Sequence, residues 1–468
     1  MRDHSQPKTR PSIAELQDVF QLVLPPQVIR ELVKVSGRRF YVRLLTPLIL
    51  VWCLIYQRLH ADHTCSGVVS YLESGGADRL EEGRSEPLSR RLDSVSNSAY
   101  CQGRQRLPLS VLEGALAHTT GVMQAHLSGQ GSWLGHVVYL LDGSTLLLRP
   151  EPELVEHYGQ HRNQHGRTYW VLMRIVVAFC LHSGSVVRVA EGSVHESEQA
   201  LAHSLLAHSA EGAVYVADCN FGVYSVAQMA QHRQQNVVFR LRTRQARAIA
   251  KRQWQSGDDI LLAWVPGRHT QRLPNLPADP IPGRLLYVRL GSPGFRPVDL
   301  YLFTNLLDRV RYPLAELVAL YGRRWHVELN LRYLKSTLDL NLLPGKSVAI
   351  VRKELTAALL AYNLIRACMV LAACRAHIAP LTLSFTEAWR RIRDAWLTLP
   401  HLSSSRRLAD AFNRLLDRLA RCRLPKQVLN RIEPRAVRRR PAVYPNLKGQ
   451  RDRARQLTLA KLLAWPNS

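Results

Sequence analysis

The sequence has no Cys-x-x-Cys pair and no apolar stretch within its first residues. None of its eight cysteines stands in a Cys-x-x-Cys motif, which excludes a zinc ribbon and a thioredoxin-type redox site. The first residues, MRDHSQPKTRPS, lack the apolar stretch of a signal peptide. Scattered cysteines are typical of a reducing compartment, so we expect a cytoplasmic protein.

Long uninterrupted hydrophobic runs are also missing. Residues 44–56 are apolar but shorter than the roughly 20 residues that span a bilayer, and Pro47 interrupts them. Residues 355–374 are long enough, yet they contain Asn363 and Arg366, which are costly in lipid and acceptable on a partly buried helix. We therefore predict no membrane segment.

Acidic residues are scarce. The chain has 36 Asp and Glu against 63 Lys and Arg, which gives a net charge of +27 and a pI near 10.3. A polyanion is the natural partner of such a chain, and an arginine-rich basic surface favours nucleic acid. A ribosomal or membrane-surface protein is the competing explanation. The 46% hydrophobic content is that of a folded protein, and the length prior of roughly 150 residues per domain indicates about three domains.

Hydrophobic periodicity changes along the chain. The first part is helical and basic, and Arg104 and Arg106 lie there at a helix pair where they would contact phosphate or solvent. Short β-rich runs then alternate with helices in an order that predicts an α/β fold. We expect a helical DNA-binding region at 1–130, a catalytic core at 131–242, a β-rich insertion at 243–312, the second part of the core at 313–400 and a basic, helical C-terminal region at 401–468.

Two aspartates follow apolar runs of the α/β region. Asp142 closes VVYLLD and Asp218 closes VYVAD, so each is expected where a buried strand ends. A sheet fixes carboxylates in such positions, and hard cations such as Mg²⁺ take oxygen ligands. A lone aspartate there is more often a turn residue or a helix cap, so the pair by itself only indicates a metal site.

A polar stripe on a later helix adds a third carboxylate. At about 100° per residue, one arc of this helix gathers a single acid among cations and an aromatic side chain. The arc contains Tyr321, Arg324, Trp325, Glu328, Arg332 and Lys335. Signs usually alternate on a solvated face, so this composition favours a site for metals and phosphates. The alternative is a surface helix with chance basic residues.

The spacing Tyr321-x2-Arg324-x3-Glu328-x6-Lys335 resembles the Y-R-E-K signature of bacterial insertion-sequence transposases of the DDE superfamily, in the insertion-sequence-four group. The similarity extends to LDGS around Asp142, to VADCNFG around Asp218, and over most of residues 40–375. It implies a ribonuclease-H-like, retroviral-integrase-like catalytic domain, interrupted by a β-rich insertion and preceded by an all-α domain.

The same resemblance implies the activity and its residues. Asp142, Asp218 and Glu328 would bind two Mg²⁺ ions, or Mn²⁺ in their place. Tyr321, Arg324 and Lys335 would contact the DNA strand near the cut, with Trp325 and Arg332 beside them on the stripe. Trp325, Trp254 or Trp264 is a candidate for stacking on an unpaired base, with core packing as the alternative. The expected partners are double-stranded DNA at transposon ends and target, and a second copy of the chain in a homodimer.

The segment Gly345-Lys346-Ser347 ends like a P-loop, but Leu340 stands where the first glycine is required. We therefore expect no nucleotide cofactor, and we interpret Lys346 as a phosphate contact to DNA. The leading hypothesis is a DNA transposase, nucleoid-associated when bound to DNA. The alternative is a non-catalytic, sequence-specific DNA-binding protein derived from one.

Overall fold

The computed structural model of the chain describes residues 23–40, 44–60, 63–78, 80, 86–92, 96–127, 131–163, 166–267, 275–291, 298–398, 405–425 and 450–463. Contacts divide the chain into one unit at Met1–Leu424 and another at Pro425–Ser468. In the second unit the structure describes the helix α16 (Arg451–Leu463). Most of residues 435–455, a strongly basic part of the predicted C-terminal region, lies outside the described residues.

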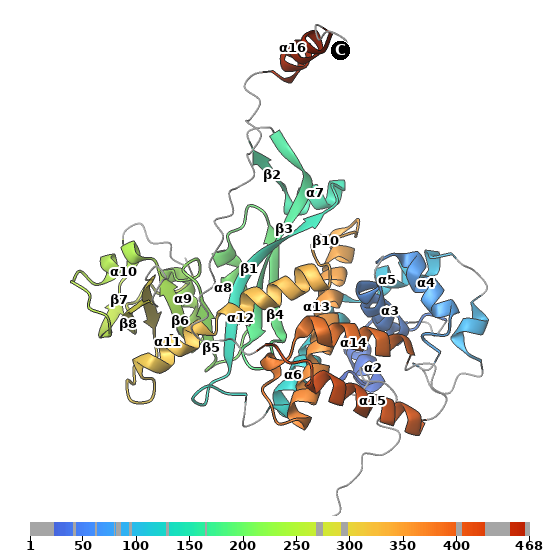
Figure 1. The fold of residues 1–468 in the computed structure, drawn as a ribbon, viewed down its shortest axis with the longest axis horizontal. Coiled ribbons are helices and arrows are strands. Elements are labelled where there is room, and N and C mark those ends of the chain that lie inside the picture. The colour runs from blue at the N-terminus through green and yellow to red at the C-terminus, as the bar shows by residue number, and fades with distance from the viewer. Residues whose placement is uncertain are drawn as a thin grey trace, which may run out of the picture. The chain divides into compact units, whose positions relative to one another are not determined.

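A single mixed sheet forms the centre of the first unit (Figure 1). The order of its main strands is β2-β3-β1-β5-β6-β9-β8-β7, with β4 paired to β3 and β10 paired to β1. The strands are β1 (Val138–Leu148), β2 (Gln160–Asn163), β3 (Gly166–Cys180), β4 (Val186–Ser193), β5 (Val214–Ala217), β6 (Asn236–Leu241), β7 (Asp258–Trp264), β8 (Ile281–Leu290), β9 (Val298–Thr304) and β10 (Leu342–Leu343). The predicted mixed α/β class is confirmed.

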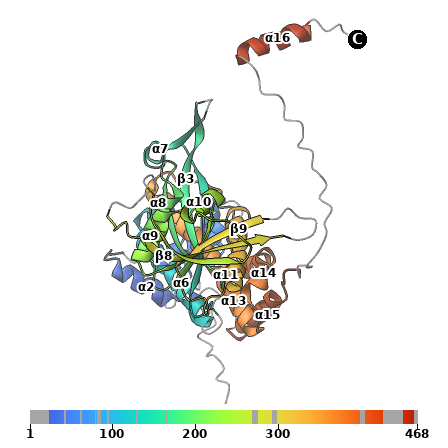
Figure 2. The ribbon, with the colours of Figure 1, turned by 90° about the vertical axis from the view of Figure 1, so that its left-hand side faces the viewer.

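Helices cover both faces of this sheet, because side chains alternate between its two sides along each strand. Leu140, Leu146 and Leu148 of β1 lie in one core with residues of α6 (Leu109–His126) and α13 (Val348–Arg375). Tyr139 and Leu141 lie in the other core with residues of α8 (Glu198–Ala207) and α9 (Tyr224–His232). Figure 2, turned by 90°, shows that the end of β3 that pairs with β2 extends beyond these helices, beside α7 (Pro152–Tyr158).

The helix α13 is long and apolar enough to cross a membrane, yet 89% of its most apolar window is buried inside the fold. It packs against α6 and against α3 (Pro47–Leu59), the other apolar segment noted in the sequence. Burial among its neighbours accounts for the hydrophobic character of α13.

The described residues before β1 contain helices and no named strand, as the sequence indicated. They are α2 (Pro26–Val35), α3, α4 (Cys65–Glu73), the short η2 (Leu88–Arg91), α5 (Ser98–Arg106) and α6. Residues 1–22, part of the predicted helical region, lie outside the described residues.

Residues 243–312 are β-rich but do not form a separate sheet. After α10 (Thr243–Ile249), strands β7, β8 and β9 form an antiparallel meander, and β9 pairs with β6 from Leu241↔Tyr301 to Val238↔Thr304. The insertion therefore extends the central sheet at its β6 edge. The domain divisions at 130, 242, 312 and 400 stay predictions.

The helix expected to carry the polar stripe is interrupted. It consists of α11 (Leu314–Gly322), α12 (Trp325–Arg332) and a π-helical turn, η3 (Tyr333–Thr337). Gly322, a weak helix former, precedes the break, where Arg324 N–H donates to Tyr321 over a three-residue span. The chain then continues through α13, η4 (Pro380–Thr382), α14 (Phe385–Thr398) and α15 (Ser405–Ala420).

Candidate active site

Strand register brings Asp142 and Asp218 together. The parallel strands β1 and β5 pair from Val138↔Val214 to Leu140↔Val216, so each aspartate lies two residues beyond the last pair. The expectation that β1 ends at Asp142 is wrong. Its ladder with β3 continues as far as Leu148↔Val171, because tertiary pairing overrides the turn propensity of Gly143 and Ser144. Asp142 therefore lies within β1, at the point where β1 leaves β5.

Each aspartate is held by one local hydrogen bond. Asp142 Oδ1 accepts from the N–H of Gly143 at 2.8 Å, and Asp218 Oδ1 accepts from the N–H of Asn220 at 2.8 Å. Among the ion pairs formed by the described residues, neither aspartate appears. The two carboxylates lie close enough for the charge of Asp218 to act on Asp142.

Burial raises the pKa of the Asp142 carboxyl to about 6. The negative charges of Asp218 and Glu198 add to the rise in this pKa, whereas the Gly143 N–H and the Arg324 guanidinium oppose it. The folded state without bound cations therefore disfavours the ionised form of Asp142.

The third carboxylate lies on α12, which packs across β1 (Figure 1). Glu328 Oε1 accepts a hydrogen bond from Arg324 Nη2 at 2.6 Å, and the Glu328 side chain is 36% exposed. Arg324 also lies over the ring of Tyr321, 6.0 Å from its centroid. Within the described part of the chain, no three His, Cys, Asp or Glu side chains stand close enough together to hold a metal ion. The two aspartates lie on neighbouring strands, and Glu328 forms an ion pair with Arg324.

The remaining residues of the stripe lie along α12 and η3. Lys335 Nζ donates to Ser144 Oγ at 3.3 Å and to the carbonyl of Thr145 at 3.2 Å, which ties η3 to β1 beside Asp142. Arg332 and Trp325 are exposed, and Trp325 retains 51% of its accessible surface. Lys346 lies apart from this stripe, 4.0 Å from Glu151 at the start of α7.

Comparisons with known proteins find relatives of this chain. The profile of the family described as "Transposase DDE domain" matches residues 133–364, which contain all three carboxylates. The chain is 25% identical over 433 residues to the transposase InsG for insertion sequence element IS4 of Escherichia coli (strain K12), covering 90% of this chain and 92% of that protein. This chain belongs to the IS4 family of DDE transposases.

Two further similarities are more distant. The putative transposase InsZ of Escherichia coli (strain K12) is 27% identical over 128 residues, which is 27% of this transposase and 43% of InsZ. A cryo-EM structure of a piggyBac transposase synaptic complex with hairpin DNA matches with a TM-score of 0.41 and 11% identity, over 88% of this chain and 85% of that one. As a member of its family, the transposase is an enzyme of the nuclease and transposase class that acts on DNA and uses divalent metal.

The helix that carries Glu328 is fixed in place by a buried cation. Arg366 of α13, 2% exposed, donates from Nη2 to Asn330 Oδ1 at 2.6 Å and from Nε to the Tyr362 hydroxyl at 2.9 Å. Its guanidinium also lies within 5.6 Å of the ring centroids of Tyr333 and Phe385. Arg366 therefore joins α12 and η3 to the core helix α13.

A fourth carboxylate, Glu198, was missed from the sequence. It stands in the first turn of α8, and a Cβ added to Gly143 would lie 2.3 Å from its carboxyl carbon. Its Oε2 accepts from Asn220 Nδ2, while Gln199 donates to Asn220 Oδ1 at 2.9 Å. The start of α8 thus holds the turn that follows Asp218. The glycine beside Asp142 was the only local signal, because helix periodicity does not show which strand a helix end will meet.

The sequence predicted that Arg104 contacts phosphate or solvent, and the structure shows a different main partner. Only 12% of the Arg104 side chain is exposed, and it forms an ion pair with Glu354 of α13 at 3.1 Å. A single helix pattern did not reveal this partner, 250 residues away. Arg106 is exposed, which agrees with the predicted contact with solvent.

Trp264 is buried in the hydrophobic core, and Trp254 packs against that core, so both follow the core-packing alternative.

We predict that Asp142→Asn stabilises the metal-free transposase above pH 6. Because the pKa of Asp142 is raised from 3.8 to about 6, ionising it opposes folding at neutral pH, and the gain amounts to at most about 3 kcal/mol. The gain should shrink as the pH falls from 6 and vanish only well below 3.8, the usual pKa of this carboxyl, where it is protonated in both states. Urea denaturation in EDTA at several pH values measures it, with exposed Asp410→Asn as the control. A gain that does not vary with pH would contradict the prediction.

We predict that Glu198→Gln moves the acidic limb of the pH profile of DNA cleavage to lower pH. The glutamine still accepts from Asn220, but it removes a negative charge that raises the pKa of Asp142. The measurement is the cleavage rate against pH at saturating metal, with exposed Glu211→Gln as the matched control. A limb that stays at its original pH, or moves equally in the control, would disprove this role of Glu198.

Proposed function

We propose that the transposase cleaves DNA at the ends of its own transposable element and joins the freed ends to target DNA. The observation that carries this proposal is the register of β1 and β5, which puts Asp142 beside Asp218 under the helix that carries Glu328. We assign these three residues as the ligands of two Mg²⁺ ions, which Mn²⁺ replaces.

The donor set suits such ions. Asp142 and Asp218 supply carboxylate oxygens without a competing ion pair among the described residues, and Asp142 is held in a costly ionised form that a cation would stabilise. Glu328 is engaged by Arg324 and is half exposed on the same side of β1 as Asp142. In the proposed reaction Glu328 leaves Arg324 to complete the ligand set.

When bound, the ions supply a water of lowered pKa as the nucleophile and stabilise the leaving 3′-oxygen. The side chains provide the remaining functions. Asp142 must lose its proton before it acts as a ligand, which sets a lower pH limit near its pKa of about 6. Arg324 offsets the negative charge of the carboxylates, and its guanidinium becomes available for a DNA phosphate once Glu328 is released. Lys335 keeps β1 and η3 together through Ser144 and Thr145.

DNA contacts are assigned to residues of the stripe and its surroundings. We propose Tyr321, Arg324, Trp325, Arg332, Lys335 and Lys346 for this role. Phosphate contacts by arginine and lysine make affinity depend steeply on salt, and the net charge of +27 is consistent with such binding. The ligands are the terminal inverted repeats and target DNA, bound by a homodimer in the bacterial cytoplasm and on the nucleoid.

We also assign a ribonuclease-H-like core. In the order β4-β3-β1-β5-β6, β3 is antiparallel to both β4 and β1, whereas β5 and β6 run parallel to β1. This order supports a core that begins at residue 131 and is resumed after the insertion at 313. The strands of the insertion then lengthen the core sheet.

We expect Asp142→Asn, Asp218→Asn and Glu328→Gln each to lower cleavage of the terminal repeats by at least 10³-fold, the order of loss when one group of a preorganised site is removed. Binding to the same repeats should remain, because each substitution removes a metal ligand and no DNA contact. EDTA should abolish cleavage by the unaltered protein in the same way.

The measurement is nicking of labelled repeats taken from the DNA that flanks the coding region, beside gel-shift binding. Arg390→Ala, on the exposed face of α14, serves as the control. Retained cleavage in one variant would remove that residue from the metal site. Binding without cleavage by the unaltered protein in Mg²⁺ and Mn²⁺ would favour the non-catalytic DNA-binding protein instead.

A further inference from the structure

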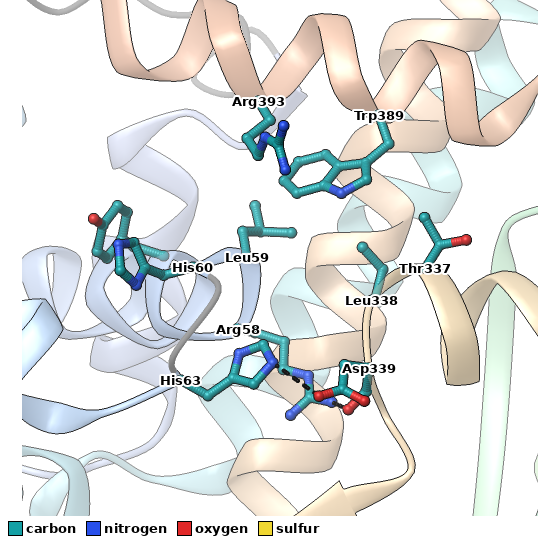
Figure 3. Close-up of a pocket in the computed structure, with 10 residues that line it drawn as sticks. Arg58, Leu59, His60, His63, Thr337, Leu338, Asp339, Trp389 and Arg393 are labelled. Atoms are coloured by element: carbon teal, nitrogen blue, oxygen red, sulfur yellow. Dashed lines mark hydrogen bonds and ion pairs between the residues drawn. The ribbon is translucent and has the colours of Figure 1, made fainter.

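A pocket of about 370 Å³ lies between the N-terminal helices and α14 (Figure 3). Its volume falls in the range of sites for small ligands. Leu59, Leu338 and Trp389 form an apolar wall, and Arg58, His60 and Arg393 supply cationic or titratable groups. The side chains come from α3, from the end of η3 and from α14, so three separate elements build the pocket.

The pocket is richer in cations than its own acid satisfies. Asp339 lines it and is 3.4 Å from His63, while Arg58 donates from Nη2 to the Asp339 carbonyl oxygen. Arg58 is only 6% exposed, and its Nε has no hydrogen-bond partner. A buried guanidinium donor without an acceptor is costly, so an anionic ligand in the pocket would stabilise it. Arg393, in the opposite wall and 3.8 Å from Asp394 on the exposed side of α14, adds a second guanidinium.

The pocket lies at the end of the helical segment α12–η3, which carries Glu328. Thr337, the last residue of η3, forms part of its wall, and Lys335 just before it is bonded to β1 beside Asp142. From Glu328 to Thr337 the helix rises on the order of 13 Å. At 3.4 Å per step along one strand, this distance corresponds to about four nucleotides.

We propose that this pocket binds one nucleotide of the element's end, about four nucleotides from the cleaved phosphate, with its phosphate on Arg58 and Arg393 and its base against Trp389 and Leu59. The inference rests on the proposed function, because the DNA must run along the α12–η3 stripe to reach the pocket. An apolar wall beside two guanidinium groups fits a base with its phosphate better than a phosphate alone.

The test uses Arg393→Ala, with Arg390→Ala as the matched control. Both arginines are exposed on α14, and Arg390 is paired with Glu387 at 2.6 Å and does not line the pocket. Binding to a duplex that carries the terminal repeat is measured in EDTA over a series of salt concentrations, so that cleavage plays no part. We expect Arg393→Ala to weaken binding about tenfold and to reduce the salt slope by about one, and Arg390→Ala to change neither.

A second variant, Leu59→Trp, fills the pocket and leaves every cation in place. It should weaken binding to a similar extent, and ethylation of single phosphates should show the same missing contact in both variants. Thermal denaturation identifies any loss of folding. Equal effects of Arg393→Ala and Arg390→Ala, or unchanged binding in both pocket variants, would overturn the proposal. So would binding of free dAMP that Arg393→Ala abolishes while duplex binding is unchanged.

The two proposals fail in different ways. If the unaltered protein binds its repeats and does not cleave them, the proposed catalysis fails while the pocket is still measurable in EDTA. If it cleaves them and the pocket variants bind normally, only the pocket assignment fails.

Discussion

The parallel pairing of β1 with β5 is the constraint on which the site depends. Backbone hydrogen bonds fix this register at Leu140↔Val216, and the two aspartates lie side by side as a result. A slip of one residue would turn Asp142 to the opposite face of the sheet, away from α12. The antiparallel ladder with β3 prevents such a slip, because it continues past Asp142 on the other side of β1. The carboxylates are therefore held by the most rigid part of the fold.

The position of Glu328 depends on a different interaction, the buried cation of Arg366. A buried charge without a carboxylate partner is costly, and here two hydrogen bonds and the faces of aromatic rings compensate for it. Both ends of this network matter for the site, since Asn330 lies one half-turn beyond Glu328 on α12. The Arg104–Glu354 pair joins the N-terminal helices to the same core helix. The helix α13 thus connects the N-terminal helices with the helix that carries the third carboxylate.

Local patterns in the sequence predicted most helices and strands, but they did not predict which elements contact one another. Short β-rich runs predicted the strands on either side of α8, and the polar stripe singled out Glu328. The end of β1 was placed at Asp142 because Gly143 and Ser144 favour a turn, and pairing with β3 overrode that local preference. Glu198 and Arg104 were missed or misplaced for a related reason. Their partners, Gly143 and Glu354, lie far along the chain, and a single sequence holds no record of such contacts.

The centre of this site is acidic, whereas its edge is basic. The charges of Asp218 and Glu198 act on Asp142, and Arg324 interacts with Asp142 and Glu328, in a protein whose net charge is +27. An acidic centre repels DNA phosphate, whereas Arg332 and Lys335 on the same stripe attract it. In the proposed function, divalent cations remove this repulsion, and Arg324 changes its partner from Glu328 to DNA. Metal and DNA should therefore each favour the binding of the other, because each replaces one half of the Arg324–Glu328 pair.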